Sequence, residues 1–219
     1  MKLVIFNGSP RQKKSNSKIL IEHFLNGYNN ICSESIPIHY LANRKQKEKE
    51  KDLFQKADTV LIIFPLYTDC MPGIVKEFFE NVLELKNKTS KKMGFIVQSG
   101  FPEAVHSITV ERYLKKFTER LNCEYLGTII KGGVEGIQIM PPWMTKKLFK
   151  RFEYLGEYFA KNGKFSAEIK EKLSKPFRMS FVRRMVFAFL CKTGLNNFYW
   201  NKNLKRNNAY MKRFDKPFQ

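Results

Sequence analysis

Residues 59–64, Thr-Val-Leu-Ile-Ile-Phe, form an uninterrupted apolar segment that ends at a proline. An apolar segment of this length without polar alternation is typical of a central strand buried on both faces of a parallel sheet. A second apolar segment, residues 2–6, ends at Asn-Gly-Ser-Pro, which indicates a strand followed by a turn. Because helical sequence separates the two segments, they predict an α/β fold.

The first 130 residues alternate between strand and helix patterns. The expected elements are strands at 2–6, 36–41, 59–64, 93–98 and 124–130, and helices at 15–28, 43–56, 74–85, 104–121, 145–162, 167–173 and about 179–192. This alternation predicts a doubly wound, five-stranded parallel sheet of order 2-1-3-4-5. Ligands are then expected beyond the carboxyl ends of the strands, in the loops after strands one, three and four.

We expect two parts along the chain. Residues 1–163 would form the core, and residues 164–219 a basic, aromatic-rich helical extension packed on the core or on a partner subunit. No apolar segment approaches the ~20 residues that span a bilayer. The N-terminus lacks the apolar region and cleavage site of a signal peptide, so a cytoplasmic location is expected.

The composition excludes several classes of protein. With 219 residues and 43% hydrophobic side chains, the chain can form a core, which excludes disorder for most of its length. The four cysteines are scattered without a CxxC pair, so neither a zinc site nor a disulfide framework follows. The three histidines, His23, His39 and His106, are isolated, and each is expected to be structural or exposed rather than catalytic.

The positive charge is concentrated late in the chain. There are 40 Lys and Arg against 20 Asp and Glu, a formal net charge of +20. Residues 1–140 carry +6 of this and residues 141–219 carry +14. Two explanations stay open: a solvated, lysine-rich surface, or an anionic partner such as a phosphorylated cofactor, a nucleic acid or an acidic membrane.

The loop after the first strand combines hydroxyls, an arginine and a helix start. Its sequence, Asn7-Gly-Ser-Pro-Arg-Gln-Lys-Lys-Ser-Asn-Ser17, fails the Walker A pattern and the GxGxxG pattern, because residue 10 is Pro and residue 13 is Lys. Hydroxyls and free N–H groups at a helix N-terminus form an anion site, to which Arg11 can add a bidentate contact. The hydroxyls favour a monophosphate over a pyrophosphate. The alternative is an ordinary capped strand–helix connection.

The loop after the third strand is apolar and rich in proline. In Phe64-Pro-Leu-Tyr-Thr-Asp-Cys-Met-Pro-Gly73, the side chains of Leu66, Tyr67 and Met71 can form the walls that a flat aromatic cofactor needs. Alternatively, Tyr67 packs against neighbouring helices. We interpret Asp69 as a turn-former or cap rather than a catalytic acid.

Together these loops resemble those of the NADPH-dependent FMN reductase group of flavodoxin-like proteins. The resemblance rests on Gly-Ser-Pro-Arg…Ser-Asn-Ser, Pro-Leu-Tyr and Pro-Gly-Ile-Val-Lys, and covers roughly residues 1–140. It implies FMN as cofactor, NADPH or NADH as reductant, and a homodimer. The implied FMN-binding residues are Ser9, Arg11, Ser15, Asn16 and Ser17 at the phosphate, Pro65, Leu66, Tyr67 and Met71 along the isoalloxazine, and Ser99, Gly100 and Phe101 in a third loop.

The function implied by this resemblance is an NAD(P)H oxidoreductase. A hydride would pass from nicotinamide to FMN, and electrons then to a small-molecule acceptor such as a quinone, a nitro compound or a flavin, with no side chain needed as a base. The alternative is an FMN electron carrier or redox sensor without substantial turnover. A third hypothesis is that the aromatic and basic residues 176–203 bind a nucleic acid or an anionic membrane surface. Packing of that segment on the core or on a second subunit is the favoured interpretation over this third hypothesis.

Overall fold

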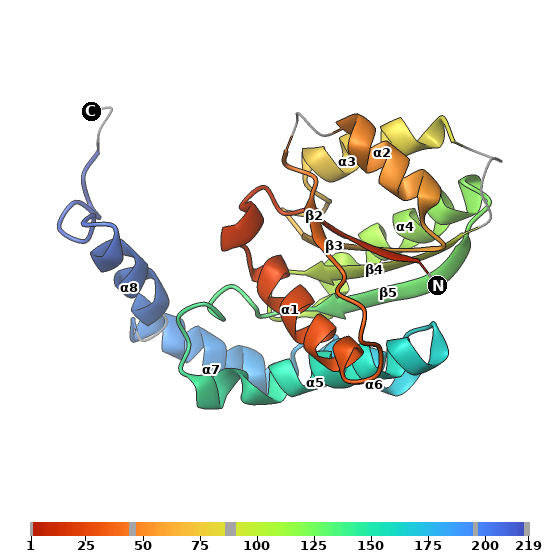
Figure 1. Ribbon diagram of the computed structural model, residues 1–219. Coiled ribbons are helices and arrows are strands. Elements are labelled where there is room, and N and C mark those ends of the chain that lie inside the picture. The colour runs from red at the N-terminus through yellow and green to blue at the C-terminus, as the bar shows by residue number, and fades with distance from the viewer. Residues whose placement is uncertain (1, 44–46, 86–90, 195–196, 217–219) are drawn as a thin grey trace. The chain divides into compact units, whose positions relative to one another are not determined.

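The computed structural model describes residues 2–43, 47–85, 91–194 and 197–216 (Figure 1). The chain divides into two compact units, residues 1–178 and residues 179–219.

The first unit contains a five-stranded sheet of order β2-β1-β3-β4-β5, and every neighbouring pair is parallel. The strands are β1 (Leu3–Asn7), β2 (Ile38–Tyr40), β3 (Thr59–Pro65), β4 (Lys92–Gln98) and β5 (Glu124–Lys131). The predicted doubly wound sheet and its strand order are therefore confirmed. β2 is shorter than expected.

The helices of the first unit follow the predicted pattern with small shifts. They are η1 (Gln12–Lys14), α1 (Asn16–Asn29), α2 (Lys47–Lys56), α3 (Gly73–Leu83), η3 (Ala104–Ser107), α4 (Ile108–Arg120), α5 (Pro142–Asn162) and α6 (Ala167–Leu173). The helix expected at 104–121 is divided into the 3-10 turn η3 and α4. The helix expected from residue 43 is described from Lys47, and residues 44–46 lie outside the described part of the chain.

Alternate side chains of the strands enter two separate cores. Leu3 and Ile5 of β1 lie in one apolar cluster, and Val4 and Phe6 lie in the other. Helices α1, α5 and α6 cover the first face of the sheet, and α2, α3 and α4 cover the second (Figure 1). Burial on both faces explains why residues 59–64 of β3 are apolar throughout, because side chains on both sides of the strand are fully buried.

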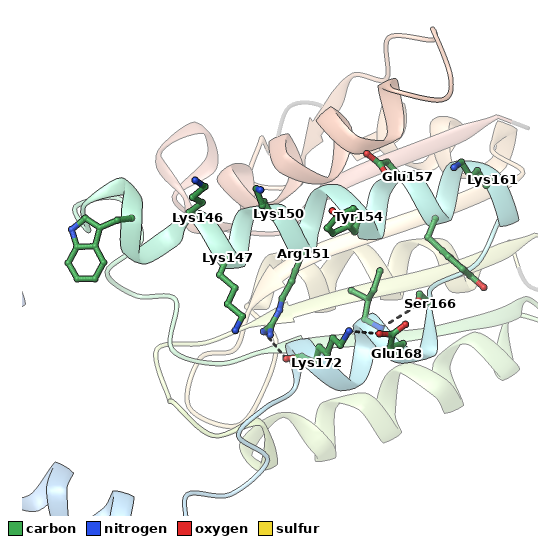
Figure 2. A pocket seen from close by; sticks show the side chains of 13 residues that line it. Lys146, Lys147, Lys150, Arg151, Tyr154, Glu157, Lys161, Ser166, Glu168 and Lys172 are labelled. Carbon is green, nitrogen blue, oxygen red and sulfur yellow. Dashed lines mark hydrogen bonds and ion pairs between the residues drawn. The ribbon is translucent and has the colours of Figure 1, made fainter.

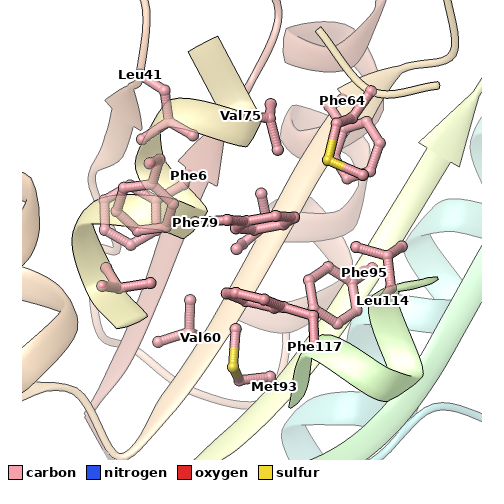
Figure 3. Packing of buried hydrophobic residues seen from close by; sticks show 14 of the residues in the cluster. Phe6, Leu41, Val60, Phe64, Val75, Phe79, Met93, Phe95, Leu114 and Phe117 are labelled. Atoms are coloured by element: carbon pink, nitrogen blue, oxygen red, sulfur yellow. The ribbon is translucent and has the colours of Figure 1, made fainter. Parts of the chain in front are cut away.

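Aromatic rings fill the second of these cores (Figure 3). The ring of Phe79 on α3 stacks on that of Phe117 on α4, with centroids 4.2 Å apart. Phe78, also on α3, lies 4.8 Å from Phe6 of β1. These contacts fix α3, the helix that follows the loop after β3, against β1 and α4.

Helices α1 and α5 approach each other backbone to backbone. A Cβ atom on Gly27 of α1 would lie 1.8 Å from the carbonyl oxygen of Glu153, and one on Gly156 of α5 would lie 1.9 Å from that of Phe24. Next to this contact, the ring of Phe159 meets that of Phe24 at 5.6 Å. The two glycines therefore set the distance between the helices.

The first unit reaches beyond the boundary that we expected after residue 163. Phe165 is buried and its ring lies 5.4 Å from that of Phe159, while Leu173 of α6 is fully buried. These side chains complete the core on the α1 face of the sheet, so α6 belongs to the first unit.

Within its described residues, 179–194 and 197–216, the second unit contains two helices, α7 (Phe181–Lys192) and α8 (Phe198–Arg206). The first was predicted, and the second was not. The guanidinium of Arg213 lies 4.2 Å from the ring centroid of Tyr210 and 4.7 Å from that of Phe214. Among the described residues of the whole chain, no helix combines the length and apolar character needed to cross a bilayer.

The contact between α1 and α5 generates a stability prediction. We expect Gly156→Ala to lower the free energy of unfolding by more than about 2 kcal/mol, because the new methyl group must separate two helix backbones. Gly73→Ala is the matched control, since a Cβ there meets nothing within 4 Å. Urea unfolding followed by circular dichroism measures both, and equal midpoints would contradict a close helix contact.

One buried carboxyl group on α2 is poorly solvated. Glu50 is 5% exposed, and its Oε1 atom has no hydrogen-bond partner among the described residues. Burial, reinforced by the nearby Glu77, raises the pKa of Glu50 to about 7, against an opposing effect of Lys47. The folded chain therefore binds a proton at Glu50 more tightly than the unfolded chain does.

This raised pKa predicts how stability depends on pH. The contribution of protonated Glu50 is present at pH values below its unfolded pKa and is lost as the pH rises through about 7. Glu50→Gln should therefore unfold at a higher temperature than the unaltered chain at pH 8, with the advantage disappearing near pH 4. Glu48→Gln, an exposed neighbour on α2, is the control. A Glu50→Gln advantage that is the same at both pH values would refute the assignment.

Candidate functional site

A buried asparagine shapes the connection between β1 and α1. The Oδ1 atom of Asn7 accepts a hydrogen bond from the N–H of Ser9 at 2.9 Å, and its Nδ2 donates to Ser15 Oγ at 3.1 Å. The N–H of Gly8 donates to the carbonyl of Ile63 at 2.8 Å, which ties the bend to β3. From the sequence, Asn7 was expected only to form part of a turn, although Asn side chains often accept a hydrogen bond from the backbone N–H two residues later.

Two of the expected phosphate ligands have protein partners for their hydroxyls. Ser15 is the N-cap of α1: its Oγ accepts from the N–H of Lys18 at 3.1 Å and donates to the carbonyl of Gln12 at 2.6 Å. Ser17 is fully buried, and its Oγ accepts from Gln98 Nε2 at 3.4 Å. For these two side chains, the local geometry is that of a capped strand–helix connection.

A cleft of about 120 Å³ lies beyond the carboxyl ends of β1, β3 and β4. It is lined by Ser9, Arg11, Asn16, Pro65, Leu66, Tyr67, Gln98, Ser99, Gly100 and Glu135. The structure thus brings together eight of the expected site residues from all three expected loops. Ser15, Ser17, Met71 and Phe101 are not among the described residues that line the cleft.

Two lining residues, Gln98 and Glu135, were not among the expected site residues. Gln98 is the last residue of β4 and follows the buried residues 93–97, none of which is polar, a signal that was available in the sequence. Glu135 comes from the loop after β5, which the strand order places at the far edge of the sheet. Its position depends on a tertiary contact that the sequence pattern does not show.

That tertiary contact is made by Asn16, the first residue of α1. Its Nδ2 donates to the carbonyls of Val134 at 2.8 Å and Glu135 at 3.3 Å, and its Oδ1 accepts from Gln138 Nε2 at 2.8 Å. The side chain of Asn16 therefore ties the loop after β5 to the start of α1. This contact brings Glu135 into the cleft.

One end of the cleft is suited to an anion. The N–H groups of Asn16 and Ser17 occupy the first turn of α1, where no intrahelical acceptor exists. Ser9 Oγ accepts from the N–H of Arg11 at 3.3 Å, which holds Arg11 at the rim. The guanidinium of Arg11 lies 3.7 Å from the carboxylate of Glu135, and both side chains are about half exposed. Glu135 thus places a carboxylate beside Arg11 at this end of the cleft.

The other end is an apolar wall with an exposed tyrosine. Leu66 is buried, and its N–H donates to the carbonyl of Gln98 at 2.7 Å. Tyr67 is 46% exposed and exchanges backbone hydrogen bonds with Cys70, so it does not pack into the helices as the alternative interpretation required. Met71 is buried in the core behind this loop, and Phe101 is exposed with its ring 4.7 Å from that of His106.

This fold and this cleft agree with a match to a protein family. A family model described as flavodoxin-like fold matches residues 1–141. The chain belongs to the flavodoxin-like family. No curated protein matches this flavodoxin-like chain significantly.

Solved structures share the flavodoxin-like fold at low sequence identity. An NADPH-quinone reductase from P. pentosaceus is 19% identical, with a TM-score of 0.55 over 74% of this chain and 99% of that one. An FMN-dependent NADH-azoreductase from Bacillus anthracis, in complex with FMN, is 18% identical, with a TM-score of 0.55 over 73% and 100%. An NAD(P)H:quinone oxidoreductase from Methanothermobacter marburgensis is 14% identical, with a TM-score of 0.57 over 72% and 96%. At such identities, the likeness supports the fold alone.

The flavodoxin-like unit also has a larger hollow away from these loops. It measures about 940 Å³ and lies between α5 and α6, where Figure 2 shows Lys147 and Arg151 extending toward α6. Arg151 donates to the carbonyl of Lys172 at 3.1 Å. None of the expected cofactor residues lines it, and it lies on a helix pair rather than at strand ends. The smaller cleft is therefore the candidate site.

The three histidines are not among the described residues that line the cleft. In the part of the chain that the structure describes, no three His, Cys, Asp or Glu residues are grouped to hold a metal ion. His23 pairs with Glu153 at 2.9 Å, and His106 with Glu103 at 3.4 Å. Burial lowers the pKa of His39, which favours its neutral form. These contacts support structural roles for the histidines.

Proposed function

We propose that this chain is an FMN-dependent NAD(P)H oxidoreductase that passes electrons to a small-molecule acceptor such as a quinone, a nitro compound or a flavin. The observation that carries the proposal is the cleft at the switch point of the sheet. It joins an anion site, made by Ser9, Arg11 and the start of α1, to the apolar wall at Leu66 and Tyr67. When bound, FMN supplies two-electron redox chemistry, and the protein supplies position and electrostatics.

The donor set fits the phosphate of FMN. A phosphate monoester would accept hydrogen bonds from Ser9 Oγ and from the first-turn N–H groups of α1, and would replace Glu135 as the partner of Arg11. At about 120 Å³, the cleft is smaller than the ~300–1,000 Å³ of most cofactor pockets, so it would enclose only part of the molecule. The exposed Tyr67 would border the part that remains outside.

An open cleft of this kind favours a mechanism in which the two substrates occupy the same site one after the other. NAD(P)H and the acceptor would reach the cofactor in turn, which predicts ping-pong kinetics. The homodimer implied by the family resemblance stays a proposal, as do the choice between NADPH and NADH and the cytoplasmic location. The neighbours described as NADPH-quinone reductase and FMN-dependent NADH-azoreductase support this reaction class for the shared fold.

A spectroscopic and kinetic experiment tests the proposed function. The purified chain is mixed with FMN, unbound FMN is removed, and the visible spectrum is recorded; oxidation of NADPH and of NADH is then followed with a quinone acceptor. We expect bound FMN and turnover well above the rate of free FMN. A chain that retains no FMN would refute the proposal. Bound FMN with turnover at the background rate would favour the alternative, an electron carrier or redox sensor.

The pair of Arg11 and Glu135 generates a prediction on FMN affinity. Arg11→Gln should weaken binding by about tenfold or more, because a charge-assisted contact to phosphate contributes about 1.5–3 kcal/mol. Glu135→Gln should tighten binding several-fold, since it removes a carboxylate that competes for Arg11 and repels the phosphate. Quenching of FMN fluorescence measures both affinities.

The control for this prediction is Lys13→Gln, an exposed change of the same charge in the same loop that does not touch the described cleft lining. If Lys13→Gln weakens binding as much as Arg11→Gln does, the effect is a general attraction of charge and Arg11 is not a phosphate ligand.

A further inference from the structure

Helix α7 presents apolar side chains to solvent along its whole length. None of its 12 residues is buried. Six of its large apolar residues are between 47% and 74% exposed, namely Phe181, Val182, Met185, Val186, Phe187 and Phe189, whereas Leu190 is partly buried. Single exposed apolar residues are normal on protein surfaces, but six within three turns of one helix indicate an interaction surface.

These side chains are distributed asymmetrically around the helix. At 100° per residue, residues 181, 185 and 189 lie next to residues 182 and 186, and the two sets form one apolar face that ends at Lys192, in the last turn of the helix. Arg183 and Arg184 lie on the opposite half, with Phe187 between them. We call residues 181, 182, 185, 186 and 189 the apolar face of α7.

The second unit is strongly basic in composition. The sequence of the second unit contains nine Lys and Arg residues and a single acidic residue, Asp215. α8 adds an exposed Phe198 and an exposed Trp200 beside Lys202, Lys205 and Arg206. The unit therefore combines a large exposed apolar area with a charge of +8.

We propose that α7 lies in the headgroup region of an anionic lipid bilayer, with its apolar face buried toward the acyl chains and its arginines at the lipid phosphates. A helix with a continuous apolar face, a basic opposite face and no acids is suited to this position. Each Lys or Arg near an anionic surface adds attraction. Tryptophan and other aromatic residues are favoured at the same depth. This inference goes beyond the proposed function and does not depend on it.

The observations favour lipid over two other occupants. A second copy of the chain would bring two units of charge +8 together, and their repulsion opposes a symmetric contact through α7. A nucleic acid would neutralise the cations but would use aromatic rings for stacking, and Val182, Met185 and Val186 of the apolar face have none. Lipid alone matches both the aliphatic side chains and the charge.

Vesicle co-sedimentation with the full chain tests the proposal. We expect binding to vesicles that contain phosphatidylserine, much weaker binding to pure phosphatidylcholine, and a decrease as salt is added. The double variant Phe181→Ser/Phe189→Ser should lose about tenfold or more in affinity for the anionic vesicles, because two large apolar side chains no longer enter the bilayer. Arg183→Gln/Arg184→Gln should reduce the preference for anionic over neutral vesicles.

Phe187→Ser is the matched control, because Phe187 is exposed on the same helix but lies off the apolar face. It should bind as the unaltered chain does. All changed residues are exposed, so the fold should persist, which circular dichroism checks. The assay needs no FMN, so its failure is distinct from a failure of the proposed enzyme.

Four outcomes would overturn the proposal. The first is no binding to anionic vesicles, and the second is equal loss of binding in Phe187→Ser and in the double variant. The third is a dimer of the lipid-free chain, seen by light scattering, that only the double variant loses; this result would assign the apolar face to a second copy. The fourth is binding of a duplex DNA oligonucleotide with the same dependence on Phe181 and Phe189, which would assign the face to nucleic acid.

Discussion

The candidate site depends on the hydrogen bonds of one buried amide, that of Asn7. Its oxygen holds the N–H of Ser9, and its nitrogen holds the hydroxyl of the Ser15 cap. Leaving such buried partners unsatisfied costs about 1–3 kcal/mol each, so the bend between β1 and α1 has little freedom. The bend in turn places Ser9, Arg11 and the positive end of α1 at the same edge of the sheet as the loop after β3. The cleft follows from that placement.

Much of this arrangement was predictable because it is determined by local sequence. The apolar segments mark strands buried on both faces, and the alternation of strands with helices indicates a doubly wound parallel sheet, whose order 2-1-3-4-5 the structure confirms. Since the carboxyl ends of parallel strands share one edge, eight expected residues from three loops do line one cleft. The pattern also located Tyr67 at the wall of the cleft, although only the structure shows that it is exposed.

The remaining features depend on contacts between distant parts of the chain. The hydroxyl of Ser17 accepts a hydrogen bond from Gln98, and Glu135 lines the cleft because Asn16 donates a hydrogen bond to its backbone carbonyl. Neither contact can be predicted from the residues that are adjacent in the sequence. Helix α8 was missed because its asparagines are weak helix formers, and the boundary at residue 163 was placed too early because Phe165 and Leu173 are buried by the sheet.

The glycine contact between α1 and α5 shows that the packed core extends beyond the segment that matches the family model. The family match ends at residue 141, one position before α5 begins. Yet the backbone of α5 touches that of α1, and Phe152, Leu155 and Phe159 of α5 are fully buried. A fragment that ended at residue 141, where the family match ends, would keep every loop of the cleft. It would, however, expose to water the side of α1 that packs on α5, and the first turn of α1 forms the anion site. The segment that matches the family model is thus shorter than the segment needed to complete the hydrophobic core.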